Sequence, residues 1–162
     1  MDDLSLTERR DKMEKFSSPD EVLDVAISME MLSYQLYTDL AERMKRPEIC
    51  RVLLDFAREE LIHKEKLDQL KANTTEWSFE DFSNIDITEF VSDVDSLEDM
   101  NYKEAVFMAM NKENAAWMFY KKLAASAVSE NLRNIFAFLA GQEEQHKQYF
   151  EKVYNDIQLK QN

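Results

Sequence analysis

Two stretches of the chain share one pattern of residues, and together they decide the fold. The first, residues 30–63, reads EMLSYQLYTDLAERMKRPEICRVLLDFAREELIH, and the second is residues 113–146. Each stretch begins with a glutamate and ends with a Glu-x-x-His motif. A constant offset without a gap, 113 − 30 = 83, pairs Glu30 with Glu113, Glu60 with Glu143 and His63 with His146. An internal repeat of this kind indicates that one supersecondary unit occurs twice.

Residues that break helices are almost absent from the sequence. The 162 residues include one glycine and two prolines, and 44% are hydrophobic, which is ordinary for a soluble globular protein. A chain of this length usually forms one domain with a substantial core. We therefore expect an all-α domain over residues 18–162, preceded by a polar N-terminal arm at residues 1–17.

Capping residues and prolines divide this domain into four predicted helices. Ser18 and Pro19 are typical of a helix start, with Glu21 completing a capping box. Pro47 separates the first helix from the second, and Asn101 can cap the third. The predicted helices span about residues 19–45, 47–72, 101–128 and 129–157. Because the connection within each pair is only a few residues long, we expect antiparallel helix pairs over about residues 19–72 and 101–157.

The segment between the two pairs, residues 73–100, does not continue the helical pattern. Its apolar residues are too numerous for a free linker, and they include Trp77, Phe79, Phe82, Ile85, Ile87, Phe90 and Val91. We interpret the segment as a long crossover packed along the bundle, with a short helix near residues 87–94. The sequence thus predicts a four-helix bundle made of two antiparallel pairs and one crossover.

Each predicted helix carries an acidic or imidazole side chain in its apolar face. Residues three or four apart lie on one side of a helix, so Ala26 and Glu30 share a face, as do Glu60 and His63. The other predicted face residues are Leu23, Ile27, Tyr34, Tyr37 and Ala41; Leu53, Phe56, Leu67 and Leu70; Val106, Ala109, Met110, Glu113, Trp117, Tyr120 and Ala124; and Phe136, Leu139, Glu143, His146, Phe150 and Val153.

The inward carboxylates and imidazoles predict a site for two metal ions. A Glu-x-x-His motif places two ligands on adjacent sides of one metal, and two such motifs plus two single glutamates supply four carboxylates and two imidazoles. Without cations, four converging carboxylates in an apolar bundle would repel one another, and some would have to be protonated. This donor set suits iron or manganese better than structural zinc, which prefers cysteine and histidine. The predicted ligands are Glu30, Glu60, His63, Glu113, Glu143 and His146.

Simpler interpretations apply to single residues near the motifs. A lone Glu-x-x-His is common, so the prediction depends on both histidines of the chain occurring in repeated motifs. Glu59, Glu65 and Glu144 are interpreted as solvated charges. Tyr37 and Tyr120 lie near the ligand positions, where core packing is their default role. A hydrogen bond from either tyrosine to a ligand carboxylate is a further hypothesis.

The charge and the cysteine count exclude several classes of protein. A formal net charge of −13 argues against nucleic acid and anionic membrane surfaces as partners. No apolar stretch is long enough to span a bilayer, and the N-terminus does not resemble a secretory signal. The single cysteine, Cys50, rules out a disulfide within the chain and a four-cysteine iron site. We interpret it as a small buried thiol, and we expect a cytoplasmic protein.

In these residues the chain resembles the ferritin-like di-iron carboxylate superfamily, and it is most similar to the erythrin domain of rubrerythrins. The resemblance covers about residues 19–157 and rests on the paired Glu-x-x-His motifs. It implies a ferritin-like bundle with two iron ions, bridged by Glu60 and Glu143, with manganese or zinc as other occupants. It also implies one terminal pair of ligands, Glu30 and His63, on one ion, and a second pair, Glu113 and His146, on the other.

The resemblance further implies a redox reaction of the di-iron site with hydrogen peroxide or dioxygen, and a homodimer. Two departures qualify this expectation. Typical rubrerythrins carry a further glutamate three residues after the third-helix ligand, where this chain has Ala116, whose repeat mate is Ser33. They also carry a rubredoxin-type iron domain, so electrons here would come from an external, rubredoxin-like donor.

The sequence therefore predicts an oxidoreductase of peroxide reductase or ferroxidase type. An iron-binding or sequestration protein with little turnover is the alternative. A third interpretation is an interaction scaffold that keeps an unused site.

Overall fold

The computed structural model describes residues 18–73, 82, 85–86, 90 and 99–160. The predicted N-terminal arm lies outside this part of the chain, and so does the short helix expected near residues 87–94, apart from Phe90. The described helices are α2 (Pro19–Arg43), α3 (Pro47–Ala72), α4 (Tyr102–Ser126) and α5 (Glu130–Lys160).

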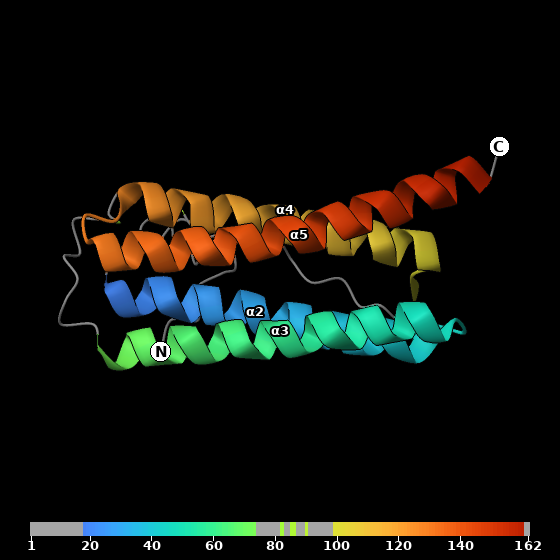
Figure 1. Cartoon of the computed structure of the whole chain (residues 1–162), viewed down its shortest axis with the longest axis horizontal. Coiled ribbons are helices and arrows are strands. Elements are labelled where there is room, and N and C mark those ends of the chain that lie inside the picture. Colours follow the sequence, from blue (N-terminus) through green and yellow to red (C-terminus); the bar gives the residue numbers. More distant parts are fainter. Residues whose placement is uncertain (1–17, 74–81, 83–84, 87–89, 91–98, 161–162) are drawn as a thin grey trace, which may run out of the picture.

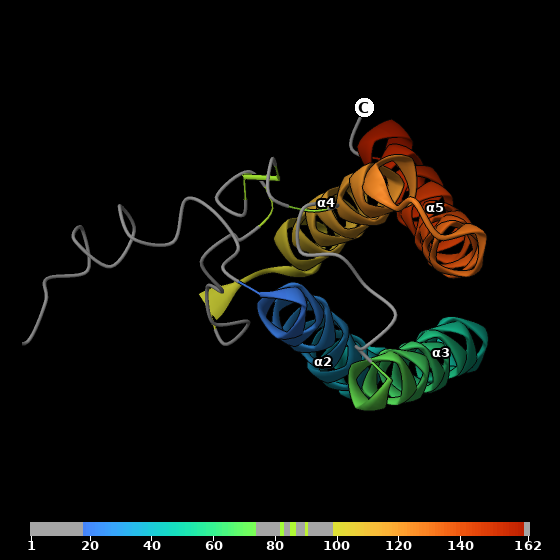
Figure 2. The same ribbon diagram turned by 90° about the vertical axis from the view of Figure 1, so that its left-hand side faces the viewer.

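These helices form the predicted bundle of two antiparallel pairs. Helix α2 packs along α3, and α4 packs along α5 (Figure 1). Seen from the end, the two pairs are two layers, with α2 and α4 facing each other on one side (Figure 2). Helix α3 ends at one end of the bundle and α4 begins at the other (Figure 1).

Local capping explains where α2 and α4 begin. The Ser18 hydroxyl accepts a hydrogen bond from the backbone N–H of Glu21 at 3.3 Å. At the start of α4, Asn101 and Glu104 form a reciprocal capping box with bonds of 2.9 and 3.0 Å. Helix α2 stops before the predicted Lys45, because Met44 adopts an extended backbone, and α5 continues beyond the predicted Ile157.

Two apolar clusters fill the bundle and leave a polar layer between them. One cluster includes Leu23, Leu67, Phe119 and Phe136, and the other includes Leu40, Leu53, Val106 and Phe150. In every helix the inward glutamate lies between residues of the two clusters. The fold therefore buries its polar residues in mid-bundle, where water is excluded on both sides.

Three residues of the crossover are buried in the first cluster, namely Phe82, Ile85 and Phe90. The prediction that the crossover packs along the bundle is confirmed for these residues. Among the described helices, none has the length and apolarity that crossing a bilayer would require.

The predicted helix faces are right in their central residues, and their half-buried members pack against the two clusters, but the faces are too narrow. Ile27, Tyr34, Phe56 and Trp117 are only half-buried. Residues that the faces omitted are buried instead, including Leu36, Leu40, Ala57, Phe119 and Leu123. Each helix contacts both its own partner and the opposite pair, so the buried face is wider than a single stripe. Cys50, expected to be buried, is half-buried beside the second cluster.

Candidate metal centre

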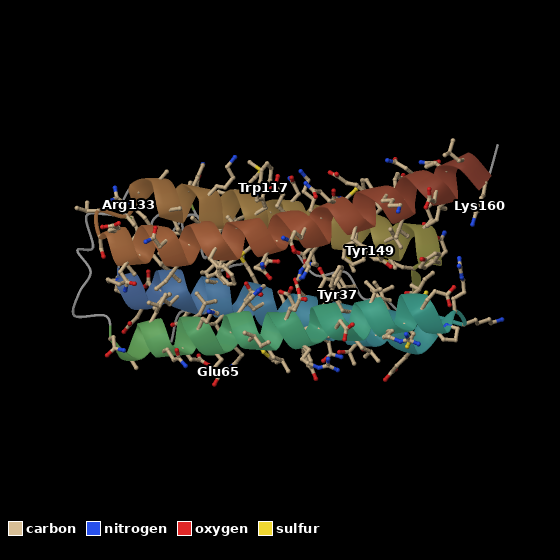
Figure 3. All side chains as sticks on the ribbon, viewed as in Figure 1. Tyr37, Glu65, Trp117, Arg133, Tyr149 and Lys160 are labelled. Carbon is tan, nitrogen blue, oxygen red and sulfur yellow. The ribbon has the colours of Figure 1, made fainter. Side chains whose placement is uncertain are left out.

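Six acidic and imidazole side chains from all four helices meet in the polar layer. They are Glu30 from α2, Glu60 and His63 from α3, Glu113 from α4, and Glu143 and His146 from α5. Each is at most 2% exposed to solvent. Figure 3 shows Tyr37 in this inner region between the helix pairs, whereas Glu65 points away from the bundle. The structure therefore brings together all the residues that the sequence predicted as ligands.

The six side chains form two overlapping groups of four. Glu30 and His63 belong to one group, and Glu113 and His146 belong to the other. Glu60 and Glu143 belong to both. Within each group the nearest ligand atoms lie within 4.8 Å of one another. This arrangement has room for two cations that share two carboxylates.

Both imidazole rings turn the Nδ1 atom toward the carboxylates. His63 Nδ1 lies 3.2 Å from Glu143 and 3.4 Å from Glu30. His146 Nδ1 lies 2.8 Å from Glu60 and 3.8 Å from Glu113. The two rings are 6.2 Å apart and nearly parallel. The lone pairs of both rings can thus face the same small space.

Several of the buried oxygen and nitrogen atoms that could bind a metal lack hydrogen bonds, although they lie close to one another. Both Nδ1 atoms, both oxygens of Glu113 and both oxygens of Glu143 have no hydrogen-bond partner in the described part of the chain. Buried polar groups in folded proteins are almost always hydrogen-bonded. This number of unpaired polar atoms in one place therefore indicates a missing positive partner. Oxygen-rich ligation with two imidazoles fits two iron or manganese ions. The residues present therefore fit a di-metal centre.

Burial and mutual repulsion dominate the electrostatics of the cluster. Burial, and then the charge of Glu143, raise the pKa values of Glu30, Glu60 and Glu113 above the usual range. Burial opposes ionisation of Glu143 too, but contacts with both histidines hold its pKa well below the usual range. Burial also lowers the pKa of His63, but Glu143 and Glu30 outweigh it and raise that pKa to about 10. Without metal, the cluster therefore retains protons at neutral pH.

One of the two predicted tyrosine contacts exists in the structure. The Tyr120 hydroxyl donates a hydrogen bond of 2.5 Å to Glu30. Its repeat mate Tyr37 is also fully buried, but its hydroxyl has no hydrogen-bond partner among the described residues. The Tyr37 ring instead packs against Phe150 and His146, with ring centres 5.3 and 6.2 Å away.

Glu59 has a role that the sequence interpretation missed. It was expected to be a solvated charge, but its carboxylate lies 2.6 Å from Nε2 of His146. A carboxylate at Nε2 favours the tautomer that carries the proton there and leaves Nδ1 free to bind a metal. The equivalent residue of the repeat is Gln142, 59 + 83 = 142, so the two halves differ here. Glu65 is exposed and Glu144 half-buried, in keeping with solvated charges.

The two tyrosines provide a matched pair of substitutions. We expect Tyr120→Phe to lower the free energy of unfolding by about 1–3 kcal/mol, because Glu30 loses its buried donor. Tyr37→Phe should leave stability unchanged or slightly higher, because it removes a buried hydroxyl without a partner. Urea unfolding of the metal-free variants measures both effects. Equal losses in the two variants would show that the Tyr120–Glu30 bond does not stabilise the fold.

The contact of Glu59 with His146 predicts a loss of metal affinity. We expect Glu59→Ala to weaken Co²⁺ binding by about 10–100-fold, as is typical when a partner that orients a metal-binding histidine is removed. The loss of Co²⁺ affinity should be smaller for Glu59→Gln, because the amide oxygen of glutamine can still accept the hydrogen bond. Competition with a chromophoric chelator measures the affinity. Glu65→Ala, an exposed glutamate on the same helix, is the control, and an equal loss there would contradict the orienting role.

The pKa shift of His63 predicts how the stability of the metal-free protein depends on pH. A histidine whose pKa is higher in the folded state than in the unfolded state stabilises the fold fully at pH values below the unfolded pKa. This stabilisation is lost as the pH rises through the folded pKa. For His63 this window runs from 6.5 to about 10. We therefore expect the Tm of the metal-free protein to fall across this window. A Tm that stays constant or rises there would contradict the electrostatic description.

Comparisons with known proteins find a matching family and similar solved structures. A model of the rubrerythrin family matches residues 21–154. A provisionally assigned ferritin-like diiron-carboxylate protein from Thermotoga maritima has a similar structure, with a TM-score of 0.69, 20% identity, and coverage of 83% of this chain and 92% of that one. A hypothetical protein from Pyrococcus furiosus has a TM-score of 0.67 and 23% identity, with coverage of 86% and 89%.

At these identities the structural likeness establishes the fold, which is the ferritin-like bundle. A comparison with curated proteins gives no match. The family match covers most of the chain, including the four helices almost in full and all six residues of the polar cluster. The chain therefore belongs to the rubrerythrin family.

Proposed function

We propose that this chain is a non-haem di-iron protein that undergoes redox reaction with hydrogen peroxide or dioxygen. The observation that carries the proposal is the sharing of Glu60 and Glu143 between two four-residue groups. Shared carboxylates are what two adjacent cations require, and a site for one cation would not need the second histidine. Membership of the rubrerythrin family and the di-iron description of the Thermotoga maritima protein support the same assignment.

The proposed ligands divide into a shared set and two terminal pairs. Glu60 and Glu143 would serve both ions, Glu30 and His63 would complete one position, and the second terminal pair, Glu113 and His146, would complete the other. Four carboxylates balance the charge of two divalent ions, which removes the repulsion described above. Bound iron would supply Lewis acidity and reversible one-electron oxidation.

The surrounding residues of the chain would hold this centre in place. The bond from Tyr120 orients Glu30, and Glu59 orients His146 with its Nδ1 toward the cluster. The apolar clusters on either side keep bulk water away. Ser33 and Ala116 lie one helical turn after Glu30 and Glu113, and their small side chains leave space beside the ligands for a diatomic or peroxide molecule.

Electrons for repeated turnover would come from a separate donor. A rubredoxin-like protein is the kind of donor that suits a centre of this type, because the single cysteine of this chain cannot hold a four-cysteine iron site. We also propose a homodimer that functions in the cytoplasm, without nucleic acid or membrane partners.

An iron-binding protein with little turnover is the second candidate. The observation that favours it is Ala116. The resemblance to typical rubrerythrins implies a glutamate at this position that takes part in redox-linked movement of iron. Such a protein would load iron but oxidise it slowly, or release it readily to a chelator.

One experiment separates these candidates and tests the proposal. The metal-free protein is loaded anaerobically with Fe²⁺ and then mixed with hydrogen peroxide in a stopped-flow spectrometer. We expect two iron ions per chain, oxidised together on addition of peroxide and reducible again by an added donor. Glu60→Gln should lose at least one iron, because it removes a shared ligand, whereas Glu65→Gln should behave as the original protein.

The contrary outcomes are distinct. Two bound irons that peroxide and dioxygen leave in the ferrous state would contradict redox function and favour iron binding. Many irons per chain, or rapid transfer of iron to a chelator, would favour sequestration. Unchanged loading in the Glu60→Gln variant would contradict the assignment of the site itself.

A further inference from the structure

A pocket of about 290 Å³ lies between α2 and α4, beside the proposed centre. Its lining passes from exposed to buried residues. Asp24, Ser28 and Leu32 are exposed, whereas Ser33 and Ala116 are only 5% exposed. The pocket therefore leads from the surface toward the polar layer of the bundle.

The buried end of the pocket adjoins the carboxylate cluster. Ser33 and Ala116 lie one turn beyond Glu30 and Glu113 on the same sides of their helices. A molecule at this end of the pocket would therefore be next to a proposed metal ligand.

The walls of the pocket are suited to a hydrocarbon chain. Six apolar side chains line it, namely Val25, Met29, Leu32, Phe90, Ala115 and Ala116, and the polar lining residues are Asp24, Ser28, Ser33 and Lys112. Its volume is on the order of ten times the share of one molecule in liquid water, about 30 Å³, and so is far larger than hydrogen peroxide needs. Apolar walls give no advantage to a small, strongly hydrated molecule, whereas each buried methylene group strengthens binding by about fourfold. At the inner end, Ser33 offers a hydroxyl that can donate or accept a hydrogen bond.

We propose that this pocket binds an organic hydroperoxide, ROOH, with its alkyl chain between α2 and α4 and its peroxide group at Ser33. The inference rests on the proposed function and names its substrate class. In the reaction the O–O bond breaks, and two electrons from the reduced iron centre and two protons convert ROOH to ROH and H₂O. The external donor then restores the two electrons.

The pocket can be tested without turnover. Protein loaded with redox-inert Zn²⁺ is titrated with 1-hexanol, the product alcohol of hexyl hydroperoxide, and methyl NMR signals are followed. We expect saturable shifts at Val25, Met29 and Leu32. Ala115→Phe, which places a ring in the pocket wall, should abolish them. Ala125→Phe is the matched control, since Ala125 is exposed on the same helix and does not line the pocket. If Ala115→Phe does not fold, Ser28→Trp at the exposed rim replaces it.

Turnover then tests the substrate class. With iron-loaded protein and a reductant, we expect hexyl hydroperoxide to have a KM at least about tenfold lower than hydrogen peroxide, because several methylene groups are buried. Ala115→Phe should raise the KM for hexyl hydroperoxide more than the KM for hydrogen peroxide, whereas the control Ala125→Phe should leave both KM values unchanged.

The possible failures of the two proposals differ. If the protein reduces hydrogen peroxide but does not bind hexanol, the pocket inference is overturned and the proposed function stays intact. The same holds if the KM values for the two peroxides are equal. Binding of hexanol without reduction of any peroxide would overturn the hydroperoxide assignment together with the proposed function. Equal effects of Ala115→Phe and Ala125→Phe would also overturn the inference.

Discussion

Four carboxylates buried in one small space are the constraint on which the rest of this structure depends. An isolated ionised carboxylate is very costly to bury, and Glu30, Glu60, Glu113 and Glu143 would repel one another as well. The metal-free bundle can tolerate them only by holding protons, as the raised pKa values of three of them indicate. Two divalent cations would remove the same repulsion without any rearrangement of the side chains. The buried carboxylates therefore destabilise the fold unless protons or cations neutralise them.

The repeat explains why the site has two matching halves, and small differences between the halves give them different surroundings. Both halves supply one glutamate and one Glu-x-x-His motif. Tyr120 bonds to Glu30, however, while its mate Tyr37 packs against rings, and a charged Glu59 meets His146 where the repeat has a neutral Gln142. A carboxylate at Nε2 makes an imidazole a stronger electron-pair donor to a metal ion. The two metal positions should therefore differ in electronic character despite equivalent ligands.

Much of the fold could be predicted because helix periodicity and helix caps are determined by residues close together in the sequence. The meeting of the six polar residues could be predicted because the repeat places the same residue types at the same offset in both halves. The pairing of helices followed from Pro47 and the short connections. Glu59 was missed because it lies about 100° from Glu60 around α3, and only the approach of α5 brings His146 to it. The same limit applies to Leu36 and Leu40, which are buried in a cluster that also contains residues of the opposite helix pair. The pocket depends on tertiary packing between α2 and α4 and left no pattern in the sequence.

The most direct test of the central claim is a crystal structure of the protein with its natural metal, using anomalous scattering at the iron edge. We predict two anomalous peaks about 3.5–4 Å apart, as in other two-metal sites. One peak should lie beside His63 and the other beside His146, with the carboxylates of Glu60 and Glu143 between them. A single peak, no peak, or peaks that contact neither histidine would contradict the account.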